Sequence, residues 1–115
     1  MAAIAQTTFK SVKTPVTLTV TTLTSADTIT YSSGAGQILV LYNKTASPVD
    51  VTIDGAGSTT IAPSGYGGTI SVASGKVITV AANGATAVNL DNISAFLGGA
   101  VAVTGGTGVV AMLLG

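Results

Sequence analysis

The chain has 115 residues, four lysines, four aspartates and no net charge, and only 7% of its residues are charged, whereas an ordinary soluble domain has about 25%. Without arginine or a basic run the chain lacks the side chains that neutralise phosphates, so we exclude nucleic-acid binding. Without histidine or cysteine it can form neither a Ser-His-Asp triad nor a thiolate metal site. Valine, isoleucine and threonine, which favour the pleated sheet, are abundant, and they predict a single all-β domain with a thin core.

The first fourteen residues show no clean period and end at Thr14-Pro15, where proline cannot donate to a β-ladder. We therefore expect an N-terminal arm over residues 1–14 and a β-sandwich domain over residues 15–115. A frayed chain end is the alternative interpretation of the arm.

Phe9 distinguishes this arm from an ordinary tail, because it is one of only two phenylalanines and leaving it in water wastes roughly 1.5 to 3 kcal/mol of burial. Two of the four lysines lie beside it. We therefore predict that the arm docks on a neighbouring subunit and does not complete its own core. The predicted partner-contact residues are Phe9, Lys10, Val12 and Lys13.

The first clear strand begins at Val16, where VTLTVTT alternates valine or leucine with threonine, as in a half-buried strand. A short strand is expected at residues 28–31. The run QILVLYN is continuously apolar and predicts a central strand covered on both sides. In VDVTIDG, Val49, Val51 and Ile53 point one way, and Asp50, Thr52 and Asp54 point the other.

The second half of the chain repeats this rhythm of short strands and turns rich in glycine, serine and asparagine. The segment DNISAFLGG predicts one helical turn, with Asp91 or Asn92 as its cap and Gly98 as its stop. Strands joined mainly by hairpins predict an antiparallel β-sandwich or barrel of about nine to ten strands. The remaining expected strands cover residues 59–62, 69–72, 76–80, 85–90, 100–104 and 109–114.

Catalytic chemistry finds little support in the residues. Asp50 and Asp54 are the only carboxylates close in sequence, and four strand residues separate them by roughly 13 Å, more than the about 5 to 9.5 Å of a glycosidase pair. Gly106 to Ala111 matches GxGxxA, but no long helix and no acidic residue follow it. No spacing singles out a Ser-Lys pair. We predict no enzyme activity, no cofactor and no metal site.

Membrane insertion is not expected either. The start MAAIAQTTFK lacks the basic and apolar regions of a signal peptide, and the longest apolar run is VVAMLL, far shorter than a membrane span.

The stretches QILVLYNKTASPVDVTIDGAG and TIAPSGYGGTISVASGKVITV resemble small tailed-phage virion proteins, especially the decoration (cement) proteins bound outside capsids. The resemblance covers roughly residues 37–115 and rests on texture: an apolar strand ending in asparagine, a V-x-V-x-I-D-G strand, a glycine turn, a strand after A-x-G-K and a final apolar strand. It implies a β-sandwich or β-barrel, often a trimer, that clamps neighbouring capsid subunits. It supplies no catalytic residues.

The expected function is therefore that of a non-enzymatic virion protein. Its partners would be the major capsid protein or other virion subunits and further copies of itself, with a trimer as first choice, and its location would be the virion after synthesis in the host cytoplasm. The alternative is a carbohydrate-binding or phage receptor-binding β-sandwich module. The lack of tryptophan weakens that alternative, because sugar platforms depend on exposed aromatic rings.

Overall fold

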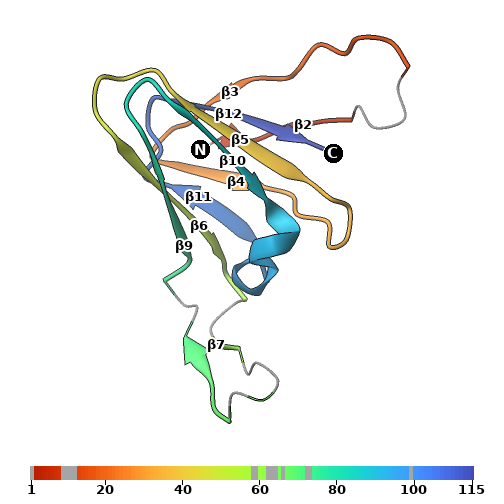
Figure 1. Cartoon of the computed structure of the whole chain (residues 1–115), viewed down its shortest axis with the longest axis vertical. Helices are drawn as coiled ribbons and strands as arrows, with labels where there is room; N and C mark the ends of the chain where they lie inside the picture. The colour runs from red at the N-terminus through yellow and green to blue at the C-terminus, as the bar shows by residue number, and fades with distance from the viewer. Residues whose placement is uncertain are drawn as a thin grey trace.

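The computed structural model describes residues 2–8, 13–57, 60–61, 65, 67–71, 74–98 and 100–115, with the side chains of residues 2, 61 and 70 left out. The regular secondary structure of the described chain is almost entirely strand, with a single short helix (Figure 1). The elements in chain order are β1 (Ala2–Ala3), β2 (Gln6–Thr7), β3 (Thr21–Thr22), β4 (Ala26–Ile29), β5 (Ile38–Asn43), β6 (Val49–Gly55), β7 (Thr60–Ile61), β8 (Ile70–Ser71), β9 (Lys76–Val80), β10 (Ala85–Asn89), the 3-10 helix η1 (Leu90–Phe96), β11 (Val101–Thr104) and β12 (Val109–Leu114).

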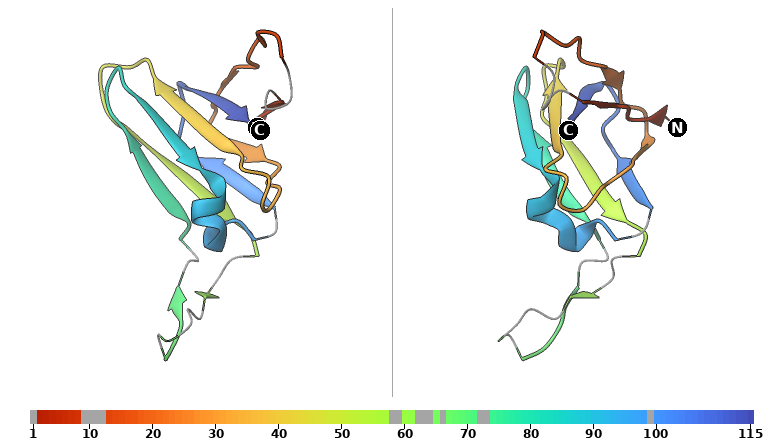
Figure 2. Two further views of the ribbon diagram at one scale, coloured as in Figure 1. Left: turned by 45° about the vertical axis from the view of Figure 1, so that its right-hand side comes forward. Right: turned by 90° about the vertical axis from the view of Figure 1, so that its right-hand side faces the viewer.

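Two five-stranded sheets form the body of the molecule. Sheet A has the order β1-β4-β11-β6-β9, and sheet B has the order β10-β5-β12-β2, with β3 also paired to β12. The pairings β1–β4 and β12–β2 are parallel, and the other pairings are antiparallel. The small ribbon β7–β8 projects from one end of the body (Figures 1 and 2). The expected all-β, mainly antiparallel sandwich is confirmed.

The core lies between the two sheets and contains the inward residues of the alternating strands. Val51 and Ile53 of sheet A and Leu39 and Leu41 of sheet B are all 0% exposed. The alternation predicted for β6 is confirmed, because Asp50, Thr52 and Asp54 lie on the opposite side of that strand. Aliphatic side chains fill almost the whole core, in agreement with the small number of aromatic residues.

The connections differ from the hairpins that the sequence predicted. Among the described strands, only β7 and β8 are both consecutive and paired. The turns after β5, β9 and β11 each lead from one sheet into the other. These turns do reverse the chain, but each returning strand finds its partner in the opposite layer. Turn residues indicate where a chain reverses and do not identify the strand that it then pairs with.

The beginning of the chain belongs to the sandwich. β1 pairs with β4 in sheet A, and β2 pairs with β12 in sheet B. Between them Ile4 is only 4% exposed, and its N–H donates to the carbonyl oxygen of Thr28 at 2.9 Å. The predicted arm over residues 1–14 is therefore wrong for residues 2–7. These two-residue strands are too short to show a period, and the single isoleucine gave no pattern to detect.

The strand expected over residues 16–22 is reduced to β3. Leu18 and Val20, which alternation would bury, are 40% and 55% exposed. The free side of β12 is divided between β3, which pairs at its start, and β2, which pairs at its end. The stretch before β3 has no sheet edge left to join, and its alternating pattern therefore forms no ladder.

The helical turn is confirmed at residues 90–96, with a different cap from the one predicted. Asn89 is the N-cap, and its side-chain oxygen accepts from the N–H of Asp91 at 3.1 Å. The Asp91 carboxylate instead holds the preceding loop, and Leu97 is the C-cap. The predicted strand at residues 28–31 begins two residues earlier, because Ala26 and Asp27 already pair with β11.

Candidate interaction surface

The outer side of sheet B is apolar over its two central strands. Because Leu39 and Leu41 of β5 point into the core, the alternating Ile38, Val40 and Tyr42 point outward. β12 does the same: Val109, Ala111 and Leu113 are buried inward, while its other residues face out. The outward residues stand opposite one another as the pairs Tyr42–Val110, Val40–Met112 and Ile38–Leu114.

β10 extends this surface toward the edge of the sheet with small side chains. Ala85 stands beside Tyr42 and Ala87 beside Val40, and both alanines are exposed. We call the eight outward residues the apolar face: Ile38, Val40, Tyr42, Ala85, Ala87, Val110, Met112 and Leu114. None of them is charged, and no charged residue occurs anywhere in β5, β10 or β12.

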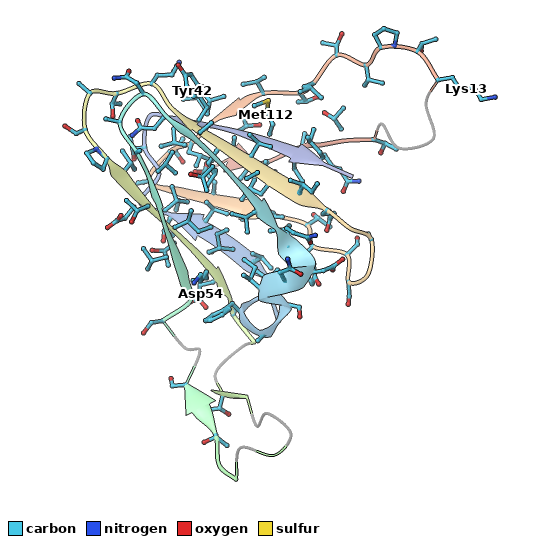
Figure 3. All side chains as sticks on the ribbon, viewed as in Figure 1. Lys13, Tyr42, Asp54 and Met112 are labelled. Atoms are coloured by element: carbon cyan, nitrogen blue, oxygen red, sulfur yellow. The ribbon has the colours of Figure 1, made fainter. Side chains whose placement is uncertain are left out.

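Exposure differs across the apolar face. Tyr42 is 39% exposed, Val110 is 8% exposed beside β3, and the other large side chains are half-buried. Tyr42 and Met112 lie at the same upper side of the sandwich (Figure 3). The sequence predicted β5 to be covered on both sides, and this is wrong for its outer side: no further layer covers the apolar face among the residues that the structure describes.

The N-terminal segment lies along β12, on the side of that strand opposite β5. Thr22 pairs with Val110, and the N–H of Thr19 donates to Oγ1 of Thr7 at 2.9 Å, next to Leu114. The exposed Leu18 and Val20 belong to this segment.

Two buried polar side chains hold the ends of β5 and so position Ile38 and Tyr42. Gln37, at 0% exposure, donates from Nε2 to Oε1 of Gln6 at 2.6 Å and accepts from the N–H of Ser32 at 2.7 Å. At the other end Asn43 donates from Nδ2 to the carbonyl oxygens of Ser47 and Val80 at 2.7 and 3.2 Å. Its Oδ1 accepts from the N–H and the hydroxyl of Thr45 at 2.9 and 2.7 Å.

A third polar group ties η1 to the loop before β5. The Asp91 carboxylate accepts from the Tyr31 hydroxyl at 2.7 Å and from the N–H groups of Gly34 and Gly36 at 3.0 Å each. The hydrogen bond to Asp91, together with burial, raises the pKa of Tyr31 above its ordinary value of 10.0. The sequence did not indicate Gln37, Asn43 or Asp91 as anchors. The contacts Gln37–Gln6, Asn43–Val80 and Tyr31–Asp91 join residues remote along the chain, and only the contacts of Asn43 with Thr45 and Ser47 are local.

The residues predicted to contact a partner fall mostly outside the described chain. Phe9, Lys10 and Val12 are not among the described residues. Lys13 is exposed and points away from the sandwich on the far end of the N-terminal segment (Figure 3). The role of these four residues as partner contacts stays a prediction.

The described residues contain no group of three or more His, Cys, Asp or Glu side chains that could hold a metal. Asp50 accepts from the Thr79 hydroxyl at 2.6 Å, and Oδ1 of Asp54 is buried without a hydrogen-bond partner in the described part of the chain. Within the same residues, no helix has the length and hydropathy needed to cross a membrane.

Sheet A carries an open hollow of about 320 Å³ near the end of β4. Its lining is neutral and mostly small, and includes Thr28, Thr30, Tyr31 and Ala100. Tyr31 is the one aromatic residue in the lining, and its hydroxyl is already bound to Asp91.

Comparison of the chain with protein-family models, with curated proteins and with solved structures finds no match in any of the three.

Proposed function

We propose that this chain is a non-enzymatic virion protein, a capsid decoration (cement) protein that binds the outside of a capsid lattice through the apolar face. The observation that carries the proposal is the outward block of Tyr42–Val110, Val40–Met112 and Ile38–Leu114 on a sheet without charge. Contiguous apolar surface that is exposed at Tyr42 and half-exposed at Val40 and Met112 is typical of protein–protein contact sites. The protein would be made in the host cytoplasm and would end in the virion.

The rest of the fold fits a clamping role. A lattice protein needs a stiff body and many shallow contacts, and the two sheets pack through a continuous aliphatic core. Buried amides at both ends of β5 hold the apolar face in one shape, so that less conformational entropy is lost on binding. The resemblance to tailed-phage decoration proteins supports the same role. The major capsid protein is the proposed partner, and self-association, with a trimer as the form that the resemblance implies, belongs to the proposal.

Virions provide the direct test. Particles are purified from the phage whose genome encodes the chain, and the copy number is measured by quantitative mass spectrometry. We expect copies in a fixed ratio to the capsid subunit. Tyr42→Asp, which places a charge in the apolar face, should lower incorporation at least tenfold, because tyrosines that become buried at the centre of an interface are frequent hot spots.

Val77→Asp is the matched control, since Val77 is 51% exposed but lies on β9 of sheet A. Its incorporation should equal that of the unmodified chain. Both variants are first checked for folding by circular dichroism. A chain that stays in the soluble lysate and is missing from purified particles refutes the proposal.

One observation favours the alternative of a carbohydrate-binding module. Tyr31 lines the open hollow on sheet A, and aromatic rings in neutral hollows suit sugar binding. A glycan array separates the two functions: binding that Tyr31→Ala abolishes and Tyr42→Asp leaves intact would favour the carbohydrate module over the decoration protein.

A further inference from the structure

The open edge of β10 presents a row of backbone groups to solvent. Backbone hydrogen bonds mark the two ends of the β10–β5 ladder. The carbonyl oxygen of Gly84 accepts from the N–H of Asn43 at 2.8 Å, and the N–H of Leu90 donates to the backbone carbonyl oxygen of Gln37 at 3.0 Å. Hydrogen-bonded and non-bonded pairs alternate in an antiparallel ladder. Residues 86 and 88 therefore also face β5, and Ala85, Ala87 and Asn89 direct their backbone groups to the open edge.

This edge lacks the usual protection. Proteins shield exposed edge strands with lysine, proline, a bulge or very short length. β10 has the sequence ATAVN, without charge or proline, and its five residues pair with β5 without a break. The other edges differ, because β9 begins with Lys76 and β1 has only two residues. β10 forms the outer edge of sheet B, and no described strand lies beyond it (Figure 2).

We propose that β10 pairs antiparallel with β10 of a second copy of this chain, around a two-fold axis at Ala87. In this register Ala87 stands opposite itself and exchanges both backbone hydrogen bonds, as in a bonded antiparallel pair. The N–H of Asn89 donates to the carbonyl of Ala85 in the other copy. A shift by two residues in either direction leaves one outward residue of each strand without a partner, so the register centred on Ala87 makes the longest ladder.

The chemistry of β10 favours a second copy as the occupant. In this register residue 87 stands against its own counterpart, so a charge at that position would meet its like. β10 has no charge, and its outward residues Ala85 and Ala87 are small enough for close approach. A strand from another protein is an outcome of the test below.

This pairing goes beyond the proposed function and does not depend on it. It would join two apolar faces into one continuous surface across a sheet of twice the width, and so strengthen attachment to a lattice by bivalency. A stable interface buries about 800 Å² per partner, and pairing between two five-residue strands buries less surface than that. We therefore expect a reversible dimer. The two-fold pair and the trimer that the resemblance implies are different assemblies, so a solution dimer through β10 would refute the trimer and leave the capsid-binding part of the proposed function in place.

Single-cysteine trapping tests the register directly, because the natural chain has no cysteine. In a bonded antiparallel pair the two Cα atoms lie about 5.5 Å apart, within the about 4.4 to 6.8 Å of a disulfide. Ala87→Cys should therefore give a disulfide-linked dimer under mild oxidation. Ala85→Cys is the matched control on the same exposed strand, since its two copies would lie about 14 Å apart. Equal cross-linking of the two variants, or none of either, overturns the proposal.

Sedimentation velocity over rising protein concentration gives the second measurement. The unmodified chain should shift from monomer to dimer, and Ala87→Lys should remain monomeric, because like charges would face each other across the axis. Val77→Lys, on the edge strand of the other sheet, should dimerise normally. A dimer that Val77→Lys removes and Ala87→Lys keeps, a trimer, or a mass that does not change with concentration contradicts the β10 pairing.

The two proposals fail separately. Tyr42→Asp should still form the Ala87→Cys disulfide when both changes are combined, although it should no longer enter virions. A chain that dimerises through β10 but never joins particles would refute the proposed function and retain the dimer. A chain that enters virions and gives no disulfide would refute the dimer alone. If no disulfide forms and a second protein, once added, protects the introduced thiol of Ala87→Cys from alkylation, the occupant is that protein's strand and the self-pairing is wrong.

Discussion

Replacing Ile4 by alanine tests whether the beginning of the chain is part of the core. Ile4 is 4% exposed, belongs to the central hydrophobic cluster and connects β1 in sheet A to β2 in sheet B. Truncating a buried isoleucine to alanine costs about 2 to 5 kcal/mol. Because a segment near a chain end can relax around the cavity, we expect the lower part of this range, about 2 to 3 kcal/mol.

The change in melting temperature follows from the size of the domain. For a chain of this length, 1 kcal/mol corresponds to about 4 °C. Ile4→Ala should therefore lower the melting temperature by roughly 8 to 12 °C in a circular dichroism scan. Val20→Ala is the control, because Val20 is 55% exposed and surface truncations usually change stability by less than about 0.5 kcal/mol.

Deleting residues 1–7 should destabilise the chain more than Ile4→Ala does. The deletion also removes the β1 and β2 ladders and Oε1 of Gln6, which accepts from the buried Gln37. If the deletion and Ile4→Ala both melt within about 2 °C of Val20→Ala, residues 2–7 are a peripheral arm after all and the core assignment of Ile4 is wrong.

Three further predictions concern the polar anchors and the apolar face. Asn43→Ala should lower the free energy of unfolding in urea by about 2 to 4 kcal/mol, because it removes the hydrogen-bond partner of the carbonyls of Ser47 and Val80 and of the N–H of Thr45. A loss below about 0.5 kcal/mol would show that water replaces the amide. The difference in absorbance titration between the unmodified chain and Tyr31→Phe should give a pKa of Tyr31 above 10.0, and Asp91→Asn should lower that pKa. Because the folded state holds the Tyr31 proton more tightly than the unfolded state, this stabilisation is present below pH 10 and disappears as the pH rises through the folded pKa. A titration midpoint at or below 10.0 contradicts the hydrogen bond between Tyr31 and Asp91. Binding of the purified chain to capsids should change less than about threefold between 50 and 500 mM salt, because the apolar face has no charge, whereas a hundredfold loss would indicate a charged interface.

Several features of the fold follow from the sequence alone. Alternation in VDVTIDG correctly separated the buried Val51 and Ile53 from the outward Asp50, Thr52 and Asp54. This succeeds because the period of two is a local property of any strand with one side in a core. The continuous apolar runs of β5 and β12 can also be seen in the sequence, but the sequence predicted β5 to be covered on both sides, whereas the structure leaves the outward residues of both strands on the outer side of sheet B.

Pairing was decided only in three dimensions. The pattern at residues 16–20 is as regular as that of β6, yet Leu18 and Val20 stay exposed, because β12 gives its free edge to β2 and β3. Ile4 shows the reverse, a buried residue in a stretch without any period. Burial depends on which distant strand leaves an edge or a cavity, and a local pattern contains no information about that strand.

The candidate surface divides in the same way. The apolar character of Tyr42, Met112 and Leu114 is written in the amino-acid sequence, but their alignment into one face requires the β5–β12 register. The open edge of β10 requires more still, because ATAVN has no feature that distinguishes an edge strand from a central one. Local side-chain chemistry therefore determined the strands and the apolar surplus, and only the non-local backbone pairing decided where that surplus and the open edge lie.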